Sequence, residues 1–142
     1  MIDKFLIEGK IKNIKGYIGE MENILVLDTK AILSNTEKIR TLERSFQLIV
    51  DTMLDINMHF ISELELKVPD NFQGTFGIIS SQTEIFPEEF ADKIAPSVGL
   101  RNRLVHRYEE VKPKFFVEQV KKEYKDFVKY LDIINRYLKK IK

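Results

Sequence analysis

The fold is decided by residues 35–64, which read NTEKIRTLERSFQLIVDTMLDINMHFISEL. Their apolar side chains recur every three or four residues, at Ile39, Leu42, Phe46, Ile49, Met53, Ile56, Phe60 and Leu64. This spacing places them on one face of a helix of about eight turns. Ser34 or Asn35 can cap its start, and Pro69 ends the element. The stretch therefore predicts one long amphipathic helix.

A second long helix is predicted before this one, over residues 3–27. Its apolar positions keep the same helical period, at Phe5, Leu6, Ile14, Ile18, Met21 and Leu25. Gly16 and Gly19 weaken the helix, and we expect them to mark a close crossing with a neighbouring helix.

Prolines divide the second half of the chain into further helices. We expect a short helix over residues 75–85, another that begins at Pro87, and a third over residues 97–111. The last helix follows Pro113, with its apolar face at Phe116, Val120, Tyr124, Phe127, Leu131, Ile134, Leu138 and Ile141. Alternation with the period of a strand is not sustained in any segment.

The composition agrees with a helical protein of one domain, residues 1–142. Hydrophobic residues make up 44% of the chain and charged residues 32%, which is typical of a globular domain. There are only 4 prolines and 6 glycines, so many short strands joined by turns are not expected. We predict an all-α, antiparallel bundle of four to five helices.

The composition also excludes several classes of protein. The chain has no cysteine, so it cannot form a disulfide framework or a thiolate metal site. Its longest apolar runs are far shorter than the roughly 20 residues of a membrane helix. The first residues lack the pattern of a signal peptide, and we expect a cytoplasmic protein.

The charge is nearly balanced overall but is unevenly distributed. The formal net charge is +1, whereas residues 112–142 contain ten Lys and Arg against four Asp and Glu. Such a basic segment can attract phosphate groups. It is equally consistent with a solvated, lysine-rich helix face.

Residues 99–108, GLRNRLVHRY, contain side chains that are able to perform chemistry. On a helix that turns by about 100° per residue, Asn102 and His106 share one side, and Arg101 lies on another, about 140° from His106. Histidine transfers protons near neutral pH, and arginine binds phosphate oxygens through its forked N–H groups. Asparagine can orient an imidazole or a ribose hydroxyl. Together they suit attack of an RNA 2′-hydroxyl on the adjacent phosphate, a reaction that needs no metal.

This stretch resembles a known family. Residues 100–108, LRNRLVHRY, are similar to the Arg-x4-6-His motif of HEPN domains, and in particular to the Arg-Asn-x-x-x-His-x-Tyr form of the HepT-like branch. Residues 40–56 resemble the second helix of that branch, and residues 96–100 resemble the segment before its motif. The resemblance extends over essentially the whole chain.

The resemblance implies a fold, an activity and partners. Members form a helical bundle that dimerises and brings two motifs together, and they act as ribonuclease toxins. The matching residues here are Arg101, Asn102 and His106, which would be catalytic. The partner would be a minimal nucleotidyltransferase antitoxin, which can transfer adenylate to the motif tyrosine, here Tyr108.

Two further groups of polar residues were considered. Asp51, Asp55 and His59 recur every four residues, as metal ligands on a helix can, but no second histidine-rich segment completes a site. We therefore expect no metal and no cofactor. Asp55 is expected to pair with Arg101 or Arg103 across the bundle and so to support the motif.

The leading hypothesis is a metal-independent endoribonuclease toxin that binds RNA and forms a homodimer. The alternative is a non-catalytic helical partner that binds and regulates a nucleotidyltransferase. A third possibility is a helical scaffold without a site. Loss of toxicity on mutation of His106 distinguishes the first from the others.

Overall fold

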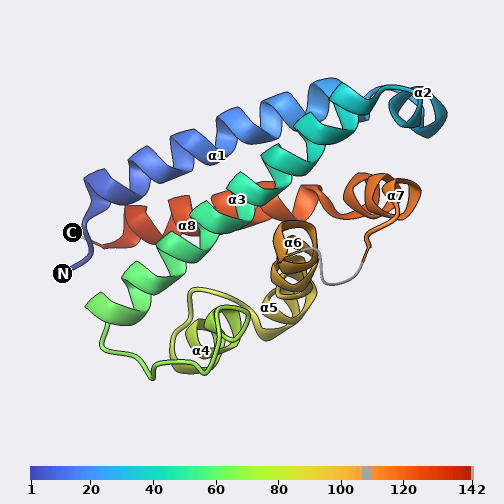
Figure 1. Ribbon diagram of the computed structural model, residues 1–142. Helices are drawn as coiled ribbons and strands as arrows, with labels where there is room; N and C mark the ends of the chain where they lie inside the picture. The colour runs from blue at the N-terminus through green and yellow to red at the C-terminus, as the bar shows by residue number, and fades with distance from the viewer. Residues whose placement is uncertain (107–109, 142) are drawn as a thin grey trace.

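The computed structural model of the protein describes residues 1–106 and 110–141. Figure 1 shows that this part of the chain is helical, without strands. Its helices are α1 (Lys4–Leu25), α2 (Thr29–Leu33), α3 (Thr36–Glu63), α4 (Thr75–Gln82), α5 (Glu88–Ile94), α6 (Pro96–His106), α7 (Pro113–Glu123) and α8 (Lys125–Lys140). The all-α prediction is confirmed.

Side-chain caps explain where the first three helices begin. The side chain of Asp3 accepts a hydrogen bond from the backbone N–H of Leu6, and that of Asn35 accepts one from the N–H of Lys38. Asp28 caps α2 in the same way. Each cap satisfies a backbone donor that has no partner within the helix.

Helix α3 runs through the middle of the molecule. It packs along α1 on one side, and α4 and α6 contact it on the other side (Figure 1). Most of the predicted apolar face of α3 is buried, at Leu42, Phe46, Ile49, Met53, Ile56 and Phe60. Ile39 and Leu64, at its two ends, are half-buried. The helix therefore supplies the floor on which the site is built.

A buried polar network joins three of these helices. The hydroxyl of Tyr130 on α8 donates to Oδ1 of Asn57 on α3 over 2.7 Å. Nδ2 of Asn57 donates to Oγ1 of Thr75 on α4 over 3.0 Å. All three residues are buried, and burial raises the pKa of Tyr130 well above its ordinary value. The network satisfies polar groups that are otherwise costly to bury.

The structure corrects several predicted boundaries. The last predicted helix is two helices that meet at Tyr124, where the N–H of Phe127 bonds to the Tyr124 carbonyl three residues earlier. The apolar spacing continues through this bend because both helices pack on the same core. Helix α2 was not predicted, and residues 110–112 are not helical.

Gly16 and Gly19 of α1 do not mark a close helix crossing. A Cβ atom built at Gly16 or Gly19 would meet no neighbouring atom within 4 Å, so the prediction of a tight contact there is wrong. In the described part of the chain, every helix is too short or too polar to span a membrane.

Candidate active site

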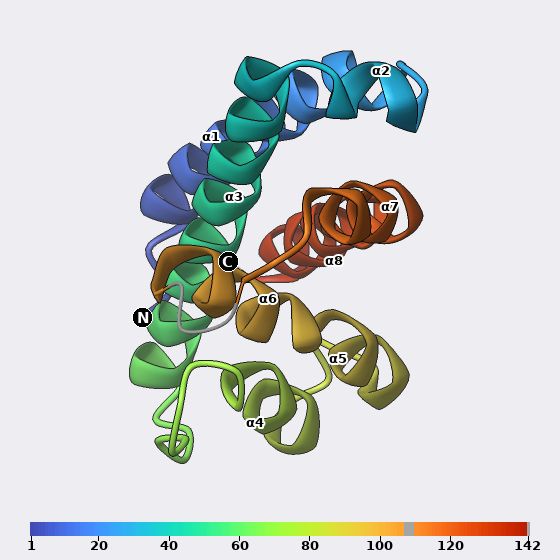
Figure 2. The ribbon, with the colours of Figure 1, turned by 45° about the vertical axis from the view of Figure 1, so that its right-hand side comes forward.

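The candidate site is formed by α6, which lies across α3 (Figure 2). Val98 of α6 is buried, and Leu100 and Leu104 are half-buried against the core. Leu100 and Leu104 lie one turn apart and set the side of α6 that packs on the core at the motif. Asn102 and His106, on the other side, are consequently exposed to solvent.

An ion pair with α3 holds Arg101 in place. Its Nε donates to Oδ1 of Asp51 over 2.6 Å. The side chain of Arg101 is only 20% exposed, whereas that of Asp51 is 36% exposed. The contact joins residues 50 positions apart in the sequence, so it exists only in the folded chain. It restricts a long, flexible side chain to one orientation.

Asn102 contributes to the same arrangement. Its Oδ1 accepts a hydrogen bond from Nη1 of Arg101 over 3.2 Å. Within the described residues, the Nη2 group of Arg101 makes no hydrogen bond. A guanidinium held at Nε and Nη1 in this way still presents N–H donors to an incoming phosphate. Asn102 therefore contacts Arg101 directly, as an orienting residue of the motif would.

His106 is the last residue of α6, and it is exposed. Tyr108, predicted as the modification site, lies outside the described residues. The structure thus brings Arg101 and Asn102 into direct contact and places His106 one turn further along the same helix.

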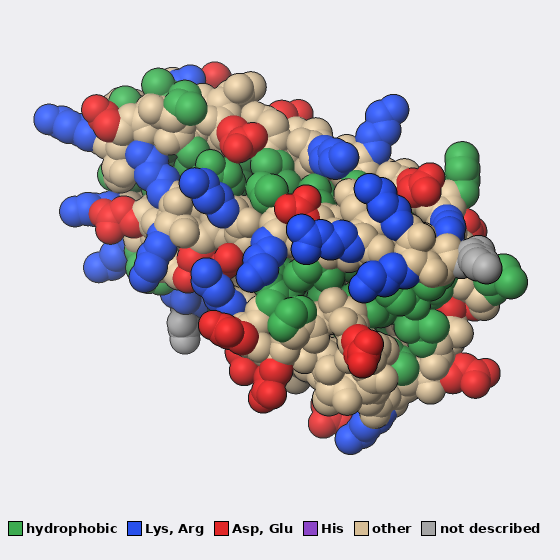
Figure 3. All heavy atoms as spheres, turned by 180° about the vertical axis from the view of Figure 1, so that it is seen from behind, with side chains coloured by type: hydrophobic (Ala, Val, Ile, Leu, Met, Phe, Trp, Pro, Cys, Tyr) green, Lys and Arg blue, Asp and Glu red, His purple; other side chains and the backbone are tan. Residues whose placement is uncertain are grey.

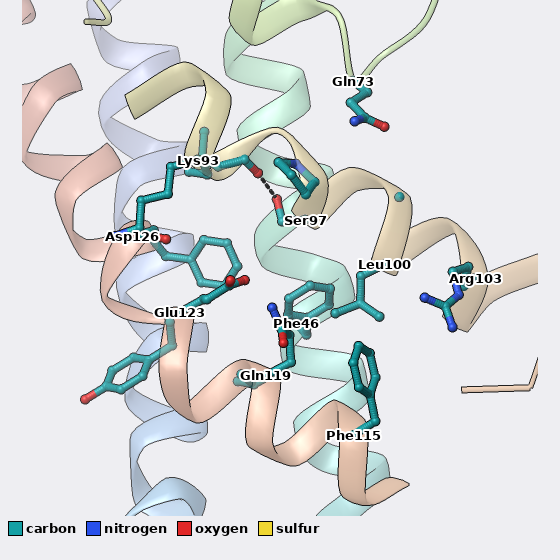
Figure 4. Close-up of a pocket in the computed structure, with 16 residues that line it drawn as sticks. Phe46, Gln73, Lys93, Ser97, Leu100, Arg103, Phe115, Gln119, Glu123 and Asp126 are labelled. Atoms are coloured by element: carbon teal, nitrogen blue, oxygen red, sulfur yellow. Dashed lines mark hydrogen bonds and ion pairs between the residues drawn. The ribbon is translucent and has the colours of Figure 1, made fainter. Parts of the chain in front are cut away.

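Arg103 points away from Arg101, toward α7. Its guanidinium carbon lies 6.0 Å from the centre of the Phe115 ring, within the range of a cation–π contact. Figure 4 shows Arg103 and Phe115 at one end of a cavity between α3, α6 and α7. Arg103, which was predicted to support the motif, therefore lies on the opposite side of α6 from Arg101.

The predicted partner of Arg101 was wrong by one helical turn. Asp55 pairs with Lys10 of α1, over 3.3 Å, and Asp51 pairs with Arg101. Asp51 and Asp55 lie one turn apart on the same side of α3, so spacing alone could not choose between them. The opposite charges of Asp51 and Arg101 allow this ion pair to be considered from the sequence. The sequence does not show, however, how α6 is placed along α3, and this placement selects Asp51 over Asp55.

The candidate metal ligands have other partners. Asp51 and Asp55 are paired with cations, and Nε2 of His59 accepts a hydrogen bond from the N–H of Asp3 over 3.0 Å. The described part of the chain contains no group of three or more His, Cys, Asp or Glu side chains that could hold a metal ion.

The basic character of the C-terminal helices is visible from behind. Figure 3 shows Lys and Arg side chains across the middle of that face, with Asp and Glu among them. Lys114 and Glu118 pair within α7, and Asp126 of α8 pairs with Lys93 of α5.

Comparison with solved structures defines the class of fold. A tri-AMPylated HEPN toxin of Shewanella oneidensis, solved in complex with MNT antitoxin, superposes with a TM-score of 0.84 at 22% identity, covering 95% of this chain and 99% of that one. YutE of Bacillus subtilis, a cytosolic protein of unknown function, gives a TM-score of 0.71 at 17% identity, covering 91% and 90%. The protein has the helical fold of HEPN toxins.

Sequence comparison then identifies the family. The family model of HepT-like ribonucleases matches residues 14–134. A tRNA nuclease HepT of Aphanizomenon flos-aquae is 32% identical over 138 residues, 96% of this chain and 92% of the relative. An mRNA nuclease HepT of Shewanella oneidensis is 27% identical over 90 residues, 63% of this chain and 67% of the relative. The chain belongs to the HepT-like ribonuclease family, and it is an endoribonuclease.

Proposed function

We propose that the protein is a metal-independent endoribonuclease toxin whose catalytic residues are Arg101, Asn102 and His106. The observation that carries the proposal is the anchored Arg101, held by Asp51 and Asn102 beside an exposed histidine. This arrangement supplies a fixed positive charge and a group able to transfer protons. Both are needed for phosphodiester cleavage.

In the proposed reaction the RNA supplies its own nucleophile. The 2′-oxygen attacks the adjacent phosphorus and loses its proton to a base, while the bond from phosphorus to the 5′-oxygen breaks. The 5′-oxygen takes up a proton, and the products are a 2′,3′-cyclic phosphate and a 5′-hydroxyl. His106 transfers the protons, and Arg101 stabilises the negative charge on the phosphate oxygens. Asn102 keeps the guanidinium in place.

The proposed partners follow from the relatives and from the exposed site. In a single copy of the chain, Asn102 and His106 of α6 are exposed to solvent. A second copy of the chain is proposed to close the site. A minimal nucleotidyltransferase antitoxin, like the MNT antitoxin bound to the Shewanella toxin, is proposed to inactivate the enzyme by adding adenylate to Tyr108. RNA cleavage by such a toxin takes place in the cytoplasm.

Cleavage of RNA in EDTA tests the chemistry. The wild type is expected to cleave with unchanged rate in EDTA, to yield 2′,3′-cyclic phosphate ends, and to leave RNA with a 2′-deoxy sugar at the cleavage site intact. His106→Ala is expected to lower the rate by at least about 100-fold, since proton transfer contributes roughly that much. His59→Ala is the matched control, because this other histidine lies on α3 and accepts a hydrogen bond from the N–H of Asp3, before the start of α1. Cleavage that stops in EDTA and returns with Mg²⁺ contradicts the mechanism.

Mass spectrometry tests the proposed modification. After incubation with ATP and the nucleotidyltransferase, the wild type and a Tyr17→Phe control are expected to gain adenylate-sized increments, whereas Tyr108→Phe gains none. Tyr108 lies seven residues after Arg101 in the sequence. The negative charge of the added phosphate would compete with RNA for the Arg101 guanidinium. Labelled protein that still cleaves RNA at full rate would remove Tyr108 from the control of the enzyme.

A further inference from the structure

The cavity beside the motif is large enough for a small ligand. Its volume is about 370 Å³, within the usual range of ligand pockets, about 300–1,000 Å³. Its floor is apolar and includes Phe46 of α3, and Leu100 of α6 forms one wall (Figure 4). This environment suits a flat, mostly apolar group better than a phosphate.

One stripe of α7 supplies the opposite wall. Phe115, Gln119 and Glu123 follow each other at intervals of four residues, so they lie on the same side of the helix. The Phe115 ring, 48% exposed, lies at the mouth of the cavity. The stripe thus presents an aromatic face, then an amide, then a carboxylate.

Glu123 is the unusual member of this stripe. It is half-buried, it points into the cavity, and within the described residues its carboxylate makes no hydrogen bond or ion pair. It is also the last residue of α7, beside Tyr124, where the C-terminus of α7 meets the N-terminus of α8 and the two helix dipoles oppose each other. Pairing within the described residues does not account for a carboxylate here, but a ligand with N–H donors would pair with it.

Guanine fits this set of groups. Its Watson–Crick edge carries two adjacent N–H donors, which a carboxylate can accept together, and beside them a carbonyl oxygen, which the Gln119 amide can bind. Adenine, cytosine and uracil do not present two adjacent donors on that edge. Phe115 provides a stacking surface for the base, and Arg103 above it can hold the attached phosphate.

We propose that the cavity between α3, α6 and α7 is a guanine-binding subsite for the RNA substrate, with Glu123 as the residue that determines specificity. This proposal rests on the proposed function as a ribonuclease. Arg101 and Arg103 lie on opposite sides of α6. An RNA strand that crosses this helix can place its cleaved phosphate at Arg101 and a neighbouring base in the cavity.

Binding of uncleavable RNA tests the proposal independently of catalysis. The probes are short 2′-O-methyl oligouridines that contain one central guanosine or one central inosine, which lacks only the 2-amino group. The wild type is expected to bind the guanosine probe about tenfold more tightly. Glu123→Gln is expected to remove this preference. Glu118→Gln, an exposed glutamate of the same helix, is the matched control and is expected to keep it.

A second variant tests stacking. Phe115→Ala is expected to weaken binding of both probes about equally, by tenfold or more, since stacking is sequence-tolerant. Phe5→Ala removes another exposed ring, on α1, and is expected to have no effect. Equal affinity of the wild type for both probes, or a preference that persists in Glu123→Gln, overturns the proposal. The proposal is also overturned if Phe115→Ala no longer binds the antitoxin but binds RNA as tightly as the wild type. If His106→Ala still cleaves RNA, the catalytic assignment fails, but the binding result stands.

Discussion

At the scale of single residues, the ion pair between Arg101 and Asp51 matters for orientation more than for stability. Both side chains are partly exposed, and pairs of this kind contribute about 0–1 kcal/mol to folding. The bond at Nε nevertheless fixes the plane of the guanidinium, and Asn102 supports it from its own helix. In the proposed reaction, the phosphate would meet a side chain that is already in position.

Removal of Asp51 is expected to lower activity without unfolding the protein. In Asp51→Ala, Arg101 can leave its position, and misplacement of a catalytic group by about 1 Å costs roughly 100-fold in rate. We expect kcat for RNA cleavage to fall 10- to 100-fold, with a melting temperature within about 4 °C of wild type. Asp55→Ala, one turn away and paired with Lys10, is the control that keeps full activity. Equal rates in both variants would show that the ion pair does not position Arg101.

At the scale of elements, α3 connects the active site to the core. Its outer side carries Asp51, and its buried side carries Asn57, which bonds to Tyr130 of α8. Thr75 extends the network to α4. Three helices are thus held in one relative position by directional bonds in addition to apolar packing, which is less directional.

Loss of the Tyr130 hydroxyl is expected to destabilise the bundle. Tyr130→Phe keeps the ring but leaves the buried Oδ1 of Asn57 without this donor, at a cost of about 1–3 kcal/mol in the free energy of unfolding. Urea denaturation monitored by circular dichroism measures this difference. Tyr137→Phe is the matched control on the same helix, because its half-buried ring packs on Phe60 and its hydroxyl makes no hydrogen bond within the described residues. A Tyr130→Phe variant as stable as Tyr137→Phe would mean that the network contributes nothing net.

At the scale of the whole molecule, the two ends of the chain lie together and away from the motif (Figure 1). Lys4 Nζ donates to the carbonyl oxygen of Ile141, which ties α1 to the end of α8. The motif lies on the exposed side of α6, with nothing from the described chain above Asn102 and His106 that would bury them. We therefore propose that a second copy of the chain closes the site.

Activity is therefore expected to depend on association. Light scattering at micromolar concentration should give the mass of a dimer, twice 16.7 kDa. The specific activity should fall when the protein is diluted below the concentration at which the dimer dissociates. A stable monomer that cleaves RNA with constant specific activity would contradict this prediction.

The sequence by itself determined the helical class, the long helix of residues 35–64 and the position of the motif, because the helical period and the prolines act over a few residues. Only the tertiary structure decided the partner of Arg101, the bend at Tyr124 and the cavity that contains Glu123. Spacing shows which face of a helix turns inward, but not how far one helix is shifted along another. A shift of one turn, about 5.4 Å, exchanges Asp51 for Asp55, and packing of the whole core determines that shift.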